Sequence, residues 1–165
     1  MAQSLQNNKQ YPEAMAIMEE ILSQNPAMLD VQVEAARMLQ QWSGGKTAEQ
    51  LTKAVNGYLP SPKNRQNAIW GWGRISVATA GKPNLEKTFF EARLELARCR
   101  YWQGLLEQDP AKREKLLQRA KSDIGQTLFN YPQLGGPEFT ERFDKLCREI
   151  QRELKQQDTG LKGLK

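Results

Sequence analysis

Residues 11–26, YPEAMAIMEEILSQNP, decide the predicted fold of this chain, because their pattern returns 34 residues later. The segment carries a small residue, apolar residues at helical spacing and a proline that ends the helix. The residues in register are Ala14 with Ala48, Ile17 with Leu51, Ile21 with Val55, and Pro26 with Pro60. A third copy extends from Ala120 to Pro132, and a period of this length predicts a helical repeat protein.

The same segment resembles the second helix of a tetratricopeptide repeat (TPR), whose family pattern is Y-x-x-A-x-x-x-[FY]-x-x-A-x-x-x-x-P. Tyr11, Ala14 and Pro26 match this pattern. Met18 stands in place of the aromatic residue, and Ile21 in place of the second alanine. The first-helix pattern of the family is weaker here, and its places are taken by Gln32, Ala35, Ala36 and Leu39.

The resemblance covers about residues 1–60 in register and returns at 90–132 with an insertion. It implies an all-α fold, an α-α superhelix or TPR-like solenoid of antiparallel helix pairs with a C-terminal capping helix. We expect a single helical domain over residues 1–155, followed by a flexible tail. Its parts are regular repeats at 1–60, degenerate repeats with a long hairpin at 61–132, a capping helix at 137–155 and the tail at 156–165. The first repeat would begin upstream of Met1, so we expect a segment of a larger protein or assembly.

Apolar spacing, prolines and glycines predict helices throughout the chain and no strand. The expected helices are residues 1–8, 11–26, 28–42, 47–60, 64–80, 84–108, 109–131 and 138–155. In the second of these we expect the inward stripe to be Ala14, Ile17, Met18, Ile21 and Leu22.

The helix at 84–108 carries two apolar stripes, which predicts packing on both sides. The first stripe is Phe89, Ala92, Leu96 and Cys99, and the second is Phe90, Leu94, Ala97, Tyr101 and Leu105. Trp70 and Trp72 are two residues apart and face different sides of a helix, so at least one belongs to the core.

Composition argues against an enzyme. The chain has no histidine, which removes the usual general base and most zinc sites. Cys99 and Cys147 are far apart and lie among apolar residues, which predicts buried free thiols. The segment Gly44-Gly45-Lys46-Thr47 resembles the end of a phosphate-binding loop, but Gln40 stands where that motif needs its first glycine. We therefore expect no catalytic residues, no cofactor and no metal.

The formal net charge of +5 favours acidic partners in general. Acidic residues interrupt the basic run at 112–121, which is typical of a solvated helix face. No apolar run approaches the roughly 18 residues that cross a bilayer, so we expect no membrane insertion. The N-terminus also lacks the apolar stretch of a signal peptide, which places the chain in the cytoplasm by default.

The TPR resemblance implies a concave groove lined by the first helix of each pair. The residues that it places there are Asp30, Val33, Arg37, Gln41, Asn64, Asn67, Arg74, Arg98, Tyr101 and Trp102. Guanidinium, amide and aromatic groups suit an acidic or carboxylate-bearing segment. We therefore expect a non-enzymatic scaffold that binds a protein or peptide. The alternative is a helical-repeat module that binds RNA or another polyanion through its basic face, although acids among the bases make nucleic acid the less favoured partner.

Overall fold

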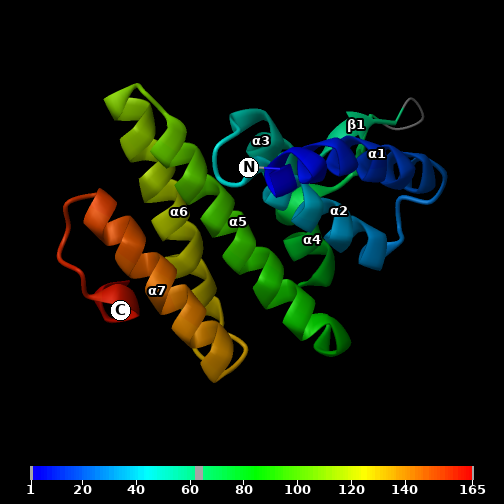
Figure 1. Cartoon of the computed structure of the whole chain (residues 1–165). Helices are drawn as coiled ribbons and strands as arrows, with labels where there is room; N and C mark the ends of the chain where they lie inside the picture. The colour runs from blue at the N-terminus through cyan, green and yellow to red at the C-terminus, as the bar shows by residue number, and fades with distance from the viewer. Residues whose placement is uncertain (1, 62–64, 165) are drawn as a thin grey trace. The chain divides into compact units, whose positions relative to one another are not determined.

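The computed structural model describes residues 2–61 and 65–164 (Figure 1). The chain is predominantly helical, as the apolar spacing predicted, and its described part contains seven α-helices and one short pair of strands. It divides into two compact units, one up to Ile75 and one from Ser76 onward. Each unit is described by itself below.

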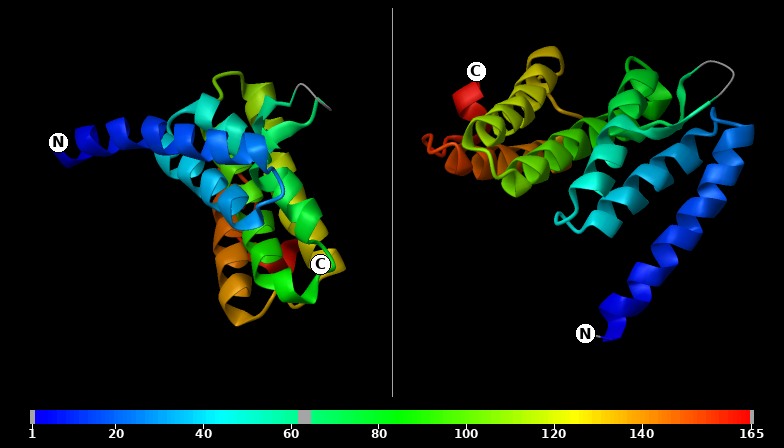
Figure 2. Two further views of the ribbon diagram at one scale, coloured as in Figure 1. Left: turned by 90° about the vertical axis from the view of Figure 1, so that its right-hand side faces the viewer. Right: turned by 90° about the horizontal axis from the view of Figure 1, so that it is seen from above.

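The first unit begins with three helices, α1 (Ala2–Gln24), α2 (Leu29–Ser43) and α3 (Ala48–Asn56). The predicted break between residues 8 and 11 is wrong, because α1 continues through Pro12 and runs past the end of α2 (Figure 2). A proline inside a helix removes one backbone hydrogen bond, but this loss alone does not reverse the direction of the chain. Pro12 is therefore accommodated inside α1, and the helix continues to Gln24, just before the turn that contains Pro26.

Helix α2 is the centre of the first unit, since it packs against both α1 and α3. Ala35, Ala36 and Leu39 are buried on it, and the small side chains of Ala35 and Ala36 allow close helix packing. On α1, the stacking of Tyr11 on Trp42 of α2, with ring centroids 6.3 Å apart, fixes one end of the pair. Among the described side chains of α1, the buried ones are Met15, which the predicted stripe did not include, and Leu22, the one residue of that stripe that is buried.

The fully buried amide of Gln32 ties α2 to the segment that follows α3. Its Nε2 donates to the carbonyl oxygens of Pro26 (2.8 Å) and Ala68 (2.6 Å), and its Oε1 accepts from the backbone N–H of Trp70 (2.8 Å). Two turns further along α2, Gln40 Oε1 accepts from Nε1 of the buried Trp72 at 2.8 Å. Both glutamines thus satisfy polar groups that burial would otherwise leave without partners.

A short antiparallel pairing of β1 (Tyr58–Pro60) with β2 (Asn67–Ile69) corrects the expectation that this chain has no strand. It also shortens the predicted helices at 47–60 and 64–80 to α3 and to α4 (Gly71–Thr79). The cause is Gly57 and Gly71, at φ 72° and 67°, whose backbones approach too closely for side chains. Positive φ ends one helix and begins the other, so the residues between them adopt extended conformations.

The second unit contains η1 (Pro83–Leu85), α5 (Glu86–Leu106), α6 (Pro110–Asn130), α7 (Pro137–Glu153) and η2 (Gly160–Leu164). The start of α6 follows from its sequence, because Asp109 caps the backbone N–H of Lys112 (2.9 Å) and Pro110 occupies the first helical position. Pro137 occupies the corresponding position of α7. These boundaries lie close to the predicted ones.

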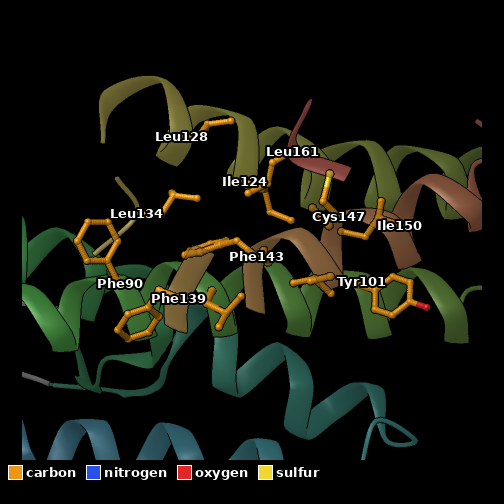
Figure 3. Close-up of a cluster of buried hydrophobic side chains, with 14 of the residues drawn as sticks. Phe90, Tyr101, Ile124, Leu128, Leu134, Phe139, Phe143, Cys147, Ile150 and Leu161 are labelled. Atoms are coloured by element: carbon orange, nitrogen blue, oxygen red, sulfur yellow. The ribbon is translucent and has the colours of Figure 1, made fainter. Parts of the chain in front are cut away.

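Helices α5, α6 and α7 surround a continuous apolar core, part of which Figure 3 shows. Phe90 and Tyr101 extend into it from α5, Ile124 from α6, and Phe143 and Ile150 from α7. The residues of the other stripe of α5 are also buried, which confirms that this helix is covered on two faces. The residues of that stripe are Phe89, Ala92, Leu96 and Cys99.

The contact between α5 and α6 also contains a charged pair. The Arg100 guanidinium, which is largely buried, forms an ion pair with the carboxylate of Asp123. Arg93 donates to the carbonyl oxygen of Asp123 (3.0 Å) and to the hydroxyl of Thr127 (2.9 Å). Since buried charges are tolerated only with partners, this network fixes the position of α6 along α5.

The structure differs from expectation at the tail. Residues 160–164 form η2, and Leu161 is buried in the core of the second unit. Gln151 of α7 exchanges two hydrogen bonds with Gly160, accepting from its N–H (2.7 Å) and donating to its carbonyl oxygen (3.1 Å). Asp144 Oδ1 accepts from the backbone N–H of Leu161 at 2.9 Å. Capture of these backbone groups by α7 orders the segment in which a flexible tail was expected.

Cys99 and Cys147 are both buried free thiols, as predicted. Burial raises the pKa of the Cys147 thiol to about 11, which leaves the group protonated and unreactive at neutral pH. Within the described residues, no helix is both long and apolar enough to cross a bilayer.

Candidate binding groove

A groove lies between α1 and α2 in the first unit. We call it the α1–α2 groove and define it by Ala14, Ile17, Met18, Ile21, Asp30, Val31 and Glu34. Its volume is about 420 Å³, and its lining is apolar except for the two carboxylates. Residues 17 and 21 are one turn apart on α1, and residues 30 and 34 are one turn apart on α2, so each helix presents one face to the groove.

Two isoleucines of the groove are open to solvent, although the sequence predicts them to be core residues. Ile17 is 61% exposed and Ile21 is 38% exposed. Their counterparts in the 34-residue register, Leu51 and Val55 of α3, are buried at 0% and 5%. The face that is covered in α3 is therefore uncovered in α1, and a surface of large apolar side chains is typical of a place where another chain packs.

The charge around the groove is negative, although the chain as a whole is basic. Residues 10–43 contain five acidic side chains and one basic side chain, Arg37. The Nη1 atom of Arg37 lies 3.5 Å from Oε2 of Glu34, and both side chains are largely exposed, so this pair is weak. Asp30 and Glu34 thus place a negative edge beside an apolar floor.

A third carboxylate near the groove, that of Glu19 on α1, makes a structural contact. Glu19 accepts a short hydrogen bond from the hydroxyl of Tyr58, which attaches β1 to α1. Burial, together with this neighbouring carboxylate, raises the pKa of the Tyr58 hydroxyl far above its ordinary value. The hydroxyl therefore stays protonated as the donor, and Glu19 is a structural residue rather than part of the groove edge.

Three of the predicted site residues on α2 share its exposed face. Asp30 lines the α1–α2 groove, and Arg37 and Gln41 follow it on the same side of the helix at spacings of seven and four residues. Val33 does not belong to this surface, since only 7% of it is exposed and its side chain packs in the core. Asp30, Arg37 and Gln41 thus lie on the exposed face of α2, and of these only Asp30 lines the groove.

Asn67 lies on β2 and Arg74 on α4, and the contacts between them hold the conformation of the segment that joins the two elements. Arg74 donates to the carbonyl oxygen of Asn67 (3.3 Å) and to Oε1 of Gln66 (3.0 Å), and its guanidinium lies 4.6 Å from the ring centroid of Trp70. Asn67 Nδ2 donates to the carbonyl oxygen of Asn56 at 3.3 Å. These contacts occupy the guanidinium of Arg74 and the side-chain amide of Asn67, the groups that a ligand would bind. Asn64, the other residue predicted here, lies outside the described residues.

The remaining predicted residues lie on α5 in the second unit. Arg98 pairs with Glu95 (3.0 Å), which also pairs with Arg142 of α7 (3.1 Å). Tyr101 is buried in the apolar core, and Trp102 packs against that core. Burial also raises the pKa of Tyr101. These residues stabilise the α5–α7 packing, so no predicted residue of α5 lies at the α1–α2 groove.

Sequence reasoning missed the exposure of Ile17 and Ile21 because it placed both in the inward stripe of α1, and it left out Met15, which is buried. A usable signal was present in the pairs Ile17-Met18 and Ile21-Leu22. Adjacent apolar residues widen the apolar arc of a helix beyond the side that one neighbouring helix covers. The part of the apolar arc of α1 that no neighbouring helix covers forms the candidate site.

No protein-family model, no curated protein and no solved structure matches this chain. The chemistry of the α1–α2 groove therefore rests on its own residues.

Proposed function

We propose that this chain is a non-enzymatic, protein-binding scaffold. In this proposal the α1–α2 groove receives the apolar side chains of a peptide or helix that also carries lysine or arginine. The observation that carries the proposal is the exposure of Ile17 and Ile21 in a hollow beside the carboxylates of Asp30 and Glu34. The lack of histidine throughout the chain supports a binding role over a catalytic one.

Apolar contact supplies the affinity in this proposal. Burying a fully exposed isoleucine stabilises a complex by roughly 1.5–3 kcal/mol, so the two partly exposed isoleucines provide a small binding core. Met18 adds an adaptable side chain at the same place, which suits partners of varied shape.

Charge supplies the selectivity. A partner with acidic residues would meet Asp30 and Glu34, and like charges at short distance oppose binding. The groove therefore favours a basic partner, whereas the composition favours an acidic one. The two differ because the net charge of +5 belongs to the whole chain and not to residues 10–43. The partner that fits is an amphipathic segment with basic residues beside its apolar face.

We also propose that the helices continue the TPR-like arrangement of a superhelix. The support is that α2 packs against both of its sequence neighbours and that short connections join α1 to α2 and α2 to α3. Short connections make neighbouring helices antiparallel, which is the arrangement of a repeat pair.

A designed peptide tests the groove directly. We would titrate the full chain with a helix-forming peptide of leucine and lysine, about four turns long, since shorter helices are marginal in water. A peptide with glutamate in place of lysine is its match. We expect the lysine peptide to bind and to shift the NMR signals of Ile17 and Ile21, and the glutamate peptide to bind at least about tenfold more weakly.

Variants of the chain separate the two contributions. The double change Ile17→Gln and Ile21→Gln should weaken binding of the lysine peptide at least about tenfold, as loss of buried anchors does. Asp30→Asn with Glu34→Gln should weaken it less and reduce its dependence on salt. Val77→Gln is the matched control, because Val77 is 77% exposed and lies outside the groove. Equal binding by all of these variants would exclude the α1–α2 groove as the site.

A further inference from the structure

The second unit has its own exposed apolar side chain on the outer face of α6. Phe129 is 85% exposed, the largest value among the exposed large apolar residues that the structure describes. It stands at the edge of a hollow of about 530 Å³ between α6 and η2. The hollow, which we call the α6–η2 hollow, is lined by Gln118, Lys121, Ser122, Gly125, Gln126, Phe129 and Leu164.

Phe129 protrudes because the helix surface beside it is low. Gly125 and Ser122 precede it on the same face of α6, four and seven residues earlier. A side chain added at Gly125 would meet no atom within 4 Å, so the surface there is open. The result is one aromatic ring that protrudes at the edge of the α6–η2 hollow.

The charge on α6 is opposite to that around the α1–α2 groove. Its exposed side chains include Lys112, Lys115 and Arg119, with Glu114 as the exposed acid. The other acid of α6, Asp123, is buried and paired with Arg100. The face that carries Phe129 therefore belongs to a helix of positive charge.

We propose that the segment received by the α1–α2 groove is α6 of a second copy of this chain, with the ring of Phe129 seated against Ile17 and Ile21. This inference rests on the proposed function of the groove. Two observations support this occupant. First, the first unit has an apolar groove, and the second unit has a protruding aromatic ring. Second, the helices that form the groove and the helix that carries the ring have opposite charge.

A groove that binds a different surface makes a heterologous contact. The groove and Phe129 of one copy then engage two different copies, so assembly continues from copy to copy as a ring or an open chain. A symmetric dimer, in which one surface meets itself, is a different outcome and is distinguishable by experiment.

Sedimentation velocity of the full chain over a wide range of protein concentration tests this. We expect assembly that grows with concentration beyond a dimer and that weakens as salt screens the charges. Ile17→Lys removes the groove and Phe129→Glu removes the ring, and each variant alone should remain monomeric. Both positions are exposed, so both variants should keep the helical circular dichroism spectrum of the parent chain.

The decisive measurement mixes the two variants. The Ile17→Lys chain keeps an intact Phe129 and the Phe129→Glu chain keeps an intact groove, so the mixture should form a 1:1 heterodimer that grows no further. Val77→Glu, a similar change at an exposed residue outside both surfaces, should assemble as the parent chain does. A parent chain that stays monomeric at every concentration, or a Phe129→Glu chain that still assembles, would overturn the proposal.

The lysine peptide distinguishes failure of this inference from failure of the groove. If the Phe129→Glu chain binds the peptide while the parent chain does not assemble, the groove stands and its partner is another protein with a basic apolar segment. If neither peptide binding nor assembly occurs, both proposals fail.

Discussion

Two glycines decide the path of the chain after α3. A Cβ at Gly57 would lie 2.1 Å from the carbonyl oxygen of Ile69, and a Cβ at Gly71 would lie 2.5 Å from the backbone nitrogen of Gly57. These contacts are with backbone atoms, which cannot turn aside as a flexible side chain can. The β1–β2 pairing therefore depends on the absence of side chains at two positions that lie 14 residues apart in the sequence.

Gly57→Ala tests this directly, with Gly81→Ala as its control. Both glycines have positive φ, at 72° and 69°, but a Cβ at Gly81 would meet nothing within 4 Å. We expect Gly81→Ala to lower the free energy of unfolding by about 1 kcal/mol from backbone strain alone. Gly57→Ala should lower it by clearly more, about 3 kcal/mol, because its Cβ also collides with the strand. Urea unfolding measures both, and equal losses would contradict the role of the close approach.

Among the elements, η2 depends on α7 for its position. Arg148 lies 2.7 Å from Asp144 and 3.1 Å from Asp158, and Asp144 also accepts from the backbone of Leu161. Burial alone would raise the pKa of Asp144, but the hydrogen bonds from Leu161 and Arg148 outweigh it and hold the pKa below its ordinary value of 3.8. A carboxylate of α7 is thus stabilised by the segment that folds back on it.

The lowered pKa predicts an acid-sensitive contact. The unfolded chain takes up the proton more readily than the folded one, so Asp144 contributes stability that is fully present above its ordinary pKa. That contribution is lost as the pH falls through the lower pKa of the folded chain. We expect the amide signals of Gly160 and Leu161 to lose hydrogen-exchange protection below about pH 4, while that of Leu94 in α5 does not. Asp144→Ala, which removes the acceptor of the Leu161 N–H, should release η2 at neutral pH. Continued protection of Leu161 in that variant would show that Leu161 is held by packing instead.

On the scale of the whole molecule, charge is unevenly distributed. The chain contains 24 basic and 19 acidic side chains, yet residues 10–43 are acidic and α6 is basic. Several of the bases are occupied by ion pairs, such as that of Arg113 with Glu153 at 2.6 Å. The charge pattern is therefore better suited to contacts between oppositely charged surfaces than to a uniform polyanion.

This distribution predicts weak binding to nucleic acid, which is the alternative function. Binding through phosphate contacts falls steeply between about 50 and 200 mM salt. We expect a single-stranded RNA to show at most weak binding at low salt and none at micromolar protein at physiological salt, by fluorescence anisotropy. Binding retained there, and lost on changing Lys112 and Lys115 to alanine, would favour the polyanion-binding alternative.

The sequence by itself determined the helical class of the chain, the two-sided burial of α5 and the buried state of both cysteines. Each of these depends on neighbours within a few turns, and the spacing of apolar residues reports such local relations directly. The start of α6 is equally local, since Asp109 and Pro110 define it without help from the rest of the chain.

Only the tertiary structure decided which part of an apolar arc is covered. Ile17 and Leu51 are equivalent in the repeat, yet one is 61% exposed and the other is fully buried. The β1–β2 pairing and the order of η2 depend in the same way on contacts with residues that are distant in the sequence. The α1–α2 groove therefore could not be predicted from periodicity. The spacing of apolar residues shows which residues could be buried, but not which helices pack against them.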